Sequence, residues 1–148
     1  MSHFPKLRLR RLRRSAGLRD IFKETEINAA DLIYPLFVVE AADEVQRISS
    51  MPGVFRQTID SLPREIDDIV KLGIKAVIIF GIPVGKDAEG SAALDPEGVV
   101  PGAIRLIKEQ ATDITVITDV CLCEYTSHGH CGVVCGREVD NDATLPLL

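Results

Sequence analysis

Some residue types are scarce in this chain of 148 residues, which has no tryptophan, two methionines and four cysteines. Long apolar runs are also missing, and even AVIIFGIPV (residues 76–84) is far too short to cross a bilayer. The basic residues near the start precede no apolar segment of the kind found in secretory signals. We therefore expect no membrane partner, and we expect a reducing, cytoplasmic setting.

The composition is otherwise that of an ordinary globular protein, with 46% apolar and 26% charged residues. The length suffices for one domain with a hydrophobic core. In a reducing compartment, clustered cysteines bind metals or take part in chemistry more often than they form disulfides.

The charge is unevenly distributed along the chain. Residues 1–19 carry seven basic residues and no acid, whereas the remainder carries ten basic and 22 acidic residues. Such an arm could bind nucleic acid or anionic lipid. It could also pack on an acidic partner subunit. No aromatic residue within the basic run is available to stack on a base, so we favour the subunit arm.

Three short apolar runs, rich in β-branched residues, are typical of strands in a buried parallel sheet, at residues 32–39, 76–82 and 114–120. Pro35 lies inside the first run and weakens that prediction. Two helical patterns alternate with the strands, at residues 61–74 and 101–110, and Gly73 is placed to close the first helix. This order predicts an α/β fold with right-handed crossovers.

Two further segments allow predictions about a loop and about the end of the chain. The polar residues 84–94 follow the second strand, and we expect a mobile loop over a site at the strand ends. Residues 140–148 begin like a new helix and then stop, with no fourth strand. We therefore expect the chain to be a fragment of a longer protein.

The segment TDVCLCEYTSHGHC (residues 118–131) holds three of the four cysteines and two of the three histidines. Cys121 and Cys123 follow the third strand, and residues two apart on an extended chain point the same way. Gly129 allows the backbone to turn back toward Cys131. Three thiolates form a soft ligand set that suits zinc.

Three interpretations of this segment remain open. A Cys121–Cys123 disulfide is disfavoured because the side chains are parallel and the ring is very small. A structural zinc site needs a fourth ligand, from Cys135, His128 or His130. An open catalytic site leaves one position to substrate, and the location at the ends of parallel strands favours it.

Asp119 directly precedes the cysteines. An acid at the end of a buried strand is costly unless it is hydrogen-bonded or functional. It could orient a substrate ammonium group or a ligand, or it could cap the following turn. His128 and His130 could orient the metal ligands, and the sequence assigns no role to Glu124 or Tyr125.

The residues DVCLCEYTSHGHCG (119–132) closely resemble the zinc segment of the porphobilinogen synthase family, also called delta-aminolevulinic acid dehydratase. Further similar stretches are RLRRLRRSAGLRDIFKET (8–25), PLFVVE (35–40), MPGVFRQ (51–57), FGIPVGKDAEGSAALDPEGVV (80–100) and VDNDATL (139–145). The resemblance thus covers nearly the whole chain.

The resemblance implies a TIM (β/α)8 barrel in a homo-octamer, with an N-terminal arm that embraces a neighbouring subunit. It implies the condensation of two 5-aminolevulinate molecules to porphobilinogen, with loss of water, in tetrapyrrole (heme) synthesis. Cys121, Cys123 and Cys131 match the family's zinc ligands, Asp119 matches an active-site acid near the substrate amino group, and Cys135 matches no ligand. The cysteines resemble those of the zinc-dependent members, and no nucleic-acid partner is implied.

The resemblance also implies that part of the enzyme lies outside this chain. No lysine here matches the family's two Schiff-base lysines, and a magnesium site would lie beyond residue 148. A barrel needs about 250 residues, so we expect residues 1–19 to form the arm and residues 20–148 about the first three βα units. Such a piece is expected to fold poorly and to be inactive alone. The alternative is a small structural zinc-binding module with a nucleic-acid-binding arm.

Overall fold

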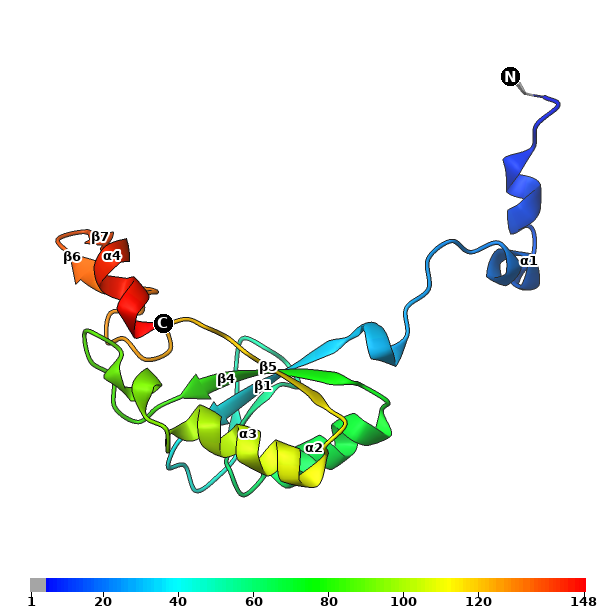
Figure 1. Ribbon diagram of the computed structural model, residues 1–148. Coiled ribbons are helices and arrows are strands. Elements are labelled where there is room, and N and C mark those ends of the chain that lie inside the picture. Colours follow the sequence, from blue (N-terminus) through cyan, green and yellow to red (C-terminus); the bar gives the residue numbers. More distant parts are fainter. Residues whose placement is uncertain (1–4) are drawn as a thin grey trace.

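The computed structural model describes residues 5–148 and contains a five-stranded sheet. Two helices lie along one face of the sheet (Figure 1). The strands pair in the order β2-β3-β1-β4-β5. Their bounds are β1 (Ile33–Val39), β2 (Gln46–Arg47), β3 (Phe55–Gln57), β4 (Ala76–Ile82) and β5 (Thr115–Thr118). The main helices are α2 (Leu62–Lys71) and α3 (Val99–Gln110). All strand pairs in this sheet are parallel except β2 with β3.

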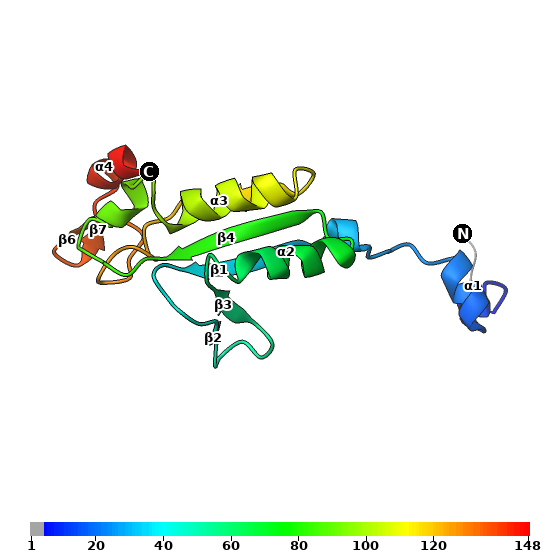
Figure 2. The same ribbon diagram turned by 90° about the horizontal axis from the view of Figure 1, so that it is seen from below.

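The chain continues past β5 into a small C-terminal unit. It contains the hairpin β6 (Val134–Cys135) and β7 (Glu138–Val139), followed by α4 (Asn141–Thr144). Short 3-10 helices span Leu9–Arg13, Ala29–Asp31, Ser91–Leu94 and Leu145–Leu147. Figure 2 shows the C-terminal unit at the arrowhead end of β4. It therefore lies at the carboxyl ends of the parallel strands.

The structure confirms the predicted α/β fold, because β1, β4 and β5 are adjacent and parallel. The third strand is shorter than expected and ends at Thr118, the last residue of β5 paired with β4. The strands β2, β3, β6 and β7 were not predicted, since segments of two or three residues carry no detectable periodicity.

Pro35 lies within β1 despite its missing backbone N–H. β1 pairs with β4 along its whole length, but with β3 only at Phe37 and Val38. Pro35 therefore lies where the β3 side of β1 has no paired strand, and a proline is tolerated there.

The core lies between the sheet and the two helices. Alternate residues of β1 and β4 point toward the helices, and they include Leu36, Val38, Val77 and Ile79. The helices contribute the remaining buried apolar side chains: Leu62, Ile66 and Ile69 from α2, and Val99, Ala103 and Ile107 from α3. On the opposite sheet face, Phe37 and Phe80 stack with ring centroids 5.3 Å apart and remain half-buried.

Both main helices have the ends that their sequences favour. α2 is followed by Gly73 at a φ of +79°, the left-handed conformation expected of a residue that closes a helix. α3 starts at Val99, two residues before its expected start, and Pro101 lies in its first turn, where no intrahelical N–H is needed.

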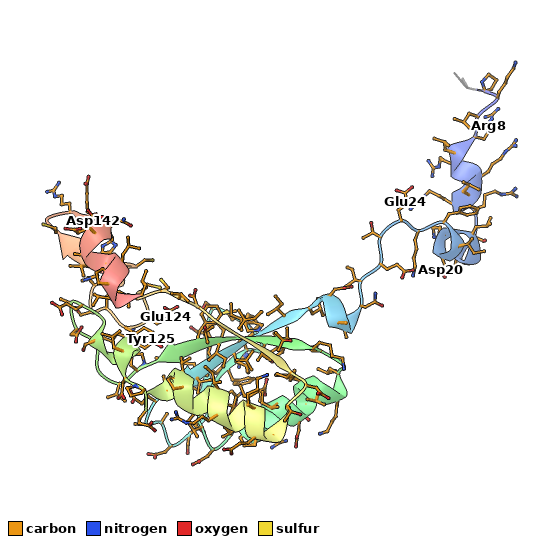
Figure 3. All side chains as sticks on the ribbon, in the orientation of Figure 1. Arg8, Asp20, Glu24, Glu124, Tyr125 and Asp142 are labelled. Atoms are coloured by element: carbon orange, nitrogen blue, oxygen red, sulfur yellow. The ribbon has the colours of Figure 1, made fainter. Side chains whose placement is uncertain are left out.

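The N-terminal arm extends away from the sheet (Figure 1). It contains α1 (Ala16–Ile21), capped by Ser15, whose hydroxyl accepts the Leu18 backbone N–H at 3.2 Å. Figure 3 shows the Arg8, Asp20 and Glu24 side chains projecting from this part of the chain. Residues 1–4 of the predicted arm lie outside the described residues. None of the helices between residues 5 and 148 is long and apolar enough to span a bilayer.

Candidate metal centre

The cysteine segment leaves the sheet directly after β5 and folds into a turn. The Leu122 carbonyl accepts the backbone N–H groups of Tyr125 and Thr126, both at 2.9 Å, and the Leu122 side chain is buried. The sequence predicts that Cys121 and Cys123 converge on an extended strand. The structure instead brings them together in this turn, because pairing with β4 ends at Thr118.

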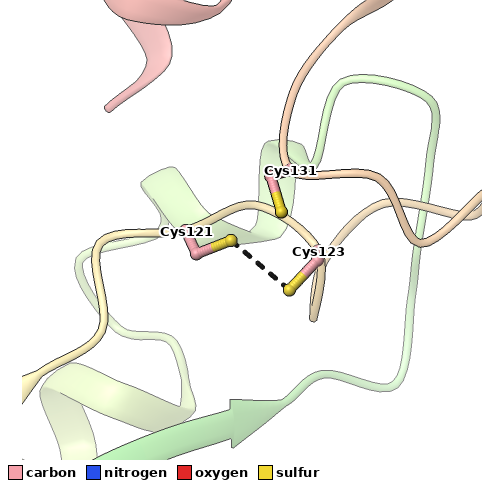
Figure 4. A group of neighbouring side chains, drawn as sticks. All are labelled: Cys121, Cys123 and Cys131. Atoms are coloured by element: carbon pink, nitrogen blue, oxygen red, sulfur yellow. Dashed lines mark hydrogen bonds between the residues drawn. The ribbon is translucent and has the colours of Figure 1, made fainter. Parts of the chain in front are cut away.

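The three cysteines of the segment form one cluster (Figure 4). The sulfur atoms of Cys121, Cys123 and Cys131 all lie within 4.8 Å of one another, and those of Cys121 and Cys123 are 3.3 Å apart. Thiolates on a tetrahedral zinc ion, each about 2.3 Å from the metal, are roughly 3.8 Å apart. The observed cluster therefore fits a zinc ion with little rearrangement.

The other candidate ligands do not join these three sulfurs in the part of the chain that the structure describes. His128 uses both ring nitrogens elsewhere: Nε2 lies 3.1 Å from the Ala88 carbonyl, and Nδ1 accepts the His130 backbone N–H at 3.1 Å. Cys135 is exposed on β6. A four-ligand structural site is thus not formed by the described residues.

Acidic groups adjoin the thiols. Asp119, Cys121 and Glu124 also place their ligand atoms within 4.8 Å of one another. The Cys121 thiol donates to the Cys123 sulfur, and the Cys123 thiol donates to the Glu124 carboxylate at 3.3 Å. Burial, followed by these two contacts, raises the pKa of the Cys123 thiol. A metal ion must therefore displace protons, so its affinity should rise with pH.

A cavity of about 240 Å³ adjoins the cluster. It lies between the end of β4, the start of α3 and the cysteine segment, and its wall includes Asp119, Cys121, Glu124 and Tyr125. Its volume is below the roughly 300–1,000 Å³ of pockets that hold drug-sized ligands. It therefore suits a small molecule held beside the thiols.

Tyr125 and Glu124, which the sequence left without a role, both line this cavity. Figure 3 labels the two side chains beside the cysteine segment. Burial raises the pKa of Tyr125, and the nearby carboxylates of Glu124, Asp119 and Glu40 raise it further. This negative environment favours a cationic group. The only sequence signal for the two residues is their position next to Cys123.

Comparison with known proteins identifies the family. Residues 6–148 match the sequence model described as delta-aminolevulinic acid dehydratase. The chain is 51% identical over 142 residues to the enzyme of that name from Helicobacter pylori, covering 95% of this chain and 44% of the relative. It is 48% identical over 145 residues to that of Methanothermus sociabilis, covering 98% and 45% respectively.

A solved structure shows similarity to the same family. The Toxoplasma gondii delta-aminolevulinic acid dehydratase, in complex with the reaction product porphobilinogen, superposes with a TM-score of 0.88 at 34% identity. The match covers 93% of this chain and 40% of that one. The chain thus spans under half the length of these relatives, as expected for part of a barrel. It belongs to the delta-aminolevulinic acid dehydratase family.

Proposed function

We propose that this chain supplies the zinc-binding part of a porphobilinogen synthase, a lyase that condenses two 5-aminolevulinate molecules to porphobilinogen with loss of water. The observation that carries the proposal is a three-thiol cluster, one of whose cysteines, Cys121, lines a small cavity, in a chain whose relatives are named for this activity. Because the chain spans under half of those relatives, the activity belongs to the longer protein.

Each site residue has a role in this proposal. Cys121, Cys123 and Cys131 hold the zinc ion through their thiolates. With three protein ligands, zinc keeps an open position and supplies Lewis-acid polarisation of a substrate oxygen. Asp119 is exposed in the cavity wall, where its carboxylate can bind a substrate ammonium group. The negative environment of Tyr125 supports the same orientation of the substrate.

The isolated chain is expected to form no product. A lysine that forms a Schiff base must reach the substrate, and no lysine among the described residues lines the cavity. The catalytic lysines, and any magnesium site, therefore belong to the part of the enzyme outside this chain.

The proposal also gives the N-terminal arm a role in assembly of the enzyme. Residues 1–19 carry only basic charges, and the rest of the chain has an excess of acids. Leu9, Ile21 and Ile27 are exposed on the segment that leads away from the sheet. We propose that this segment packs on a neighbouring subunit of a homo-octamer.

The four free cysteines suit the reducing cytoplasm.

The experiment that tests the activity is a hybrid enzyme. Residues 6–148 replace the matching segment of the Helicobacter pylori relative, and porphobilinogen formation from 5-aminolevulinate is measured. We expect the hybrid to be active and to lose nearly all activity on Cys123→Ala. The matched control, Cys135→Ser, changes a cysteine outside the cluster and should keep the activity.

A hybrid that folds like the relative and binds zinc, yet forms no porphobilinogen, would contradict the proposed activity. Equal activity of the Cys123→Ala and Cys135→Ser hybrids would contradict the assigned ligands. Separately, measurable product from the isolated 148-residue chain would show that the catalytic lysine is already present.

A further inference from the structure

The loop after β4 packs directly on the turn that carries the cysteines. Gly90 is buried in this loop, at a φ of +71°. A Cβ atom at this position would lie 3.3 Å from the Tyr125 side chain and 3.4 Å from those of Leu122 and Thr126. The loop backbone thus lies so close to the cysteine turn that an added Cβ would make tight contacts. Residues 87–91 are called the bracing loop below.

Hydrogen bonds join the bracing loop to the second half of the cysteine segment. The Ser127 backbone N–H donates to the Asp87 carbonyl at 2.7 Å, and Asp87 and Thr126 form an isolated parallel bridge. Nε2 of His128 lies 3.1 Å from the Ala88 carbonyl. Because Nδ1 of His128 accepts the His130 N–H, Nε2 carries the proton and donates.

The Asp87 carboxylate determines the shape of the bracing loop. Its Oδ1 accepts the backbone N–H groups of Glu89, Gly90 and Ser91, at 2.9, 2.6 and 3.1 Å. Its Oδ2 accepts the Ser91 hydroxyl. These bonds, led by that of the Ser91 hydroxyl, lower the pKa of Asp87 to about 2. The carboxylate is therefore ionised at neutral pH. It orders a turn whose backbone carbonyl groups face the cysteine segment.

The connection continues to the third cysteine. The Thr126 hydroxyl donates to the His130 carbonyl at 2.8 Å, which fixes the residue next to Cys131. Thr126 and Ser127 are in turn held by Asp87. We propose that Asp87 is a positioning residue for the metal centre, which acts through the bracing loop to place Cys131 beside Cys121 and Cys123. The identity of the metal rests on the proposed function.

The test compares three variants of the hybrid enzyme described above. Asp87→Ala removes every acceptor of the side chain, whereas Asp87→Asn keeps Oδ1 for the three backbone donors. Asp95→Ala is the matched control, since Asp95 accepts the Glu97 N–H at 2.9 Å in a similar turn and does not line the cavity. Zinc affinity is measured by competition with a chelator, and Co²⁺ absorption reports the geometry of the thiolates.

We expect Asp87→Ala to weaken zinc binding about tenfold or more, the usual effect of losing a group that orients metal ligands. Asp87→Asn should recover most of the affinity, and Asp95→Ala should match the parent. Unchanged affinity in Asp87→Ala would overturn the proposal. Equal losses in Asp87→Ala and Asp87→Asn would also overturn it, because charge rather than loop shape would then be responsible.

A second readout separates this inference from the proposed function. Amide hydrogen exchange at Ser127 and His130 is measured in the metal-free parent hybrid and in its Asp87→Ala variant. Faster exchange in the variant supports the positioning role, and equal exchange overturns it, even if the parent binds no zinc and the metal assignment fails. If Asp87→Ala does not fold, Ser91→Ala removes only the hydroxyl bond and should show a smaller change in the same direction.

Discussion

At the residue scale, one carboxylate connects α2 to the sheet. Glu65 accepts the Tyr34 hydroxyl at 2.7 Å on one oxygen and the Gln57 amide at 3.2 Å on the other. Burial, together with the hydrogen bond to Glu65 and its charge, raises the pKa of Tyr34 to about 12. The folded chain therefore favours the neutral phenol.

Replacing Tyr34 with phenylalanine tests this connection. The change leaves Glu65 with one partner, and we expect it to lower the free energy of unfolding by about 1–2 kcal/mol near neutral pH. Because the folded-state pKa is raised from 10.0, the contribution of Tyr34 is complete below pH 10 and is lost as the pH rises through about 12. Denaturant titrations of both chains should therefore converge above pH 12. A constant difference across this range would contradict the assignment.

The sequence indicates the cysteine cluster better than its surroundings. Cys121, Cys123 and Cys131 could be named as candidate ligands because three soft ligands within eleven residues suit a metal, and the family resemblance set Cys135 aside. The roles of Glu124, Tyr125 and Asp87 could not be predicted, since they depend on a turn and on a loop from 30 or more residues earlier in the chain. The tautomer of His128 follows from the His130 N–H, which donates to Nδ1 and leaves Nε2 to donate to the same loop.

At the element scale, α4 fixes the chain just after Cys131. The buried Thr144 hydroxyl accepts the Val133 N–H at 3.0 Å and donates to the Asp140 carbonyl at 2.6 Å. Gly132 packs so closely that an added Cβ would collide with the Thr144 side chain. The cysteine segment is thus held by the bracing loop on one side and by α4 on the other.

Gly132→Ala should displace α4 and loosen Cys131. We expect a loss of about 1–3 kcal/mol of unfolding free energy, the usual cost of overpacking, together with weaker zinc binding. Gly17→Ala is the control, because a Cβ at this position in α1 meets nothing within 4 Å and alanine favours a helix. Chemical denaturation and chelator competition measure both effects. A Gly132→Ala chain with the stability of the Gly17→Ala chain would refute the close packing.

The elements themselves were predictable in proportion to their length. β1, β4, α2 and α3 each have seven or more residues and show a clear apolar pattern. The hairpin of β6 and β7 and the four-residue α4 have no such pattern. Hydrogen bonds of Thr144 and Asp140 join α4 to the hairpin.

At the scale of the whole molecule, α2 and α3 cover only one sheet face within the described residues, and the N-terminal arm extends away from the sheet. Ile78, Phe37 and Phe80 are only half-buried on the face away from α2 and α3. The sequence could indicate an incomplete barrel, because a closed one needs about 250 residues. It could not show how the arm leaves the sheet, since no periodic pattern connects them (Figure 1).

Removing the arm should affect assembly but not the metal site. We expect a hybrid enzyme that lacks residues 6–28 to form a smaller oligomer by light scattering and to bind zinc as tightly as the complete hybrid. The reason is that the arm extends away from the cysteine segment and carries exposed apolar and basic side chains. An unchanged mass would contradict the proposed role of the arm.

The central claim is that three thiols of this chain form a zinc site with no fourth cysteine ligand. The most direct test is the zinc content of the purified hybrid enzyme, compared with its Cys123→Ala and Cys135→Ser variants. We predict stoichiometric zinc in the parent and in Cys135→Ser, and its loss in Cys123→Ala. Retention of zinc by Cys123→Ala, or its loss from Cys135→Ser, would contradict the assigned site. A parent hybrid without zinc would contradict the claim that Cys121, Cys123 and Cys131 hold the metal.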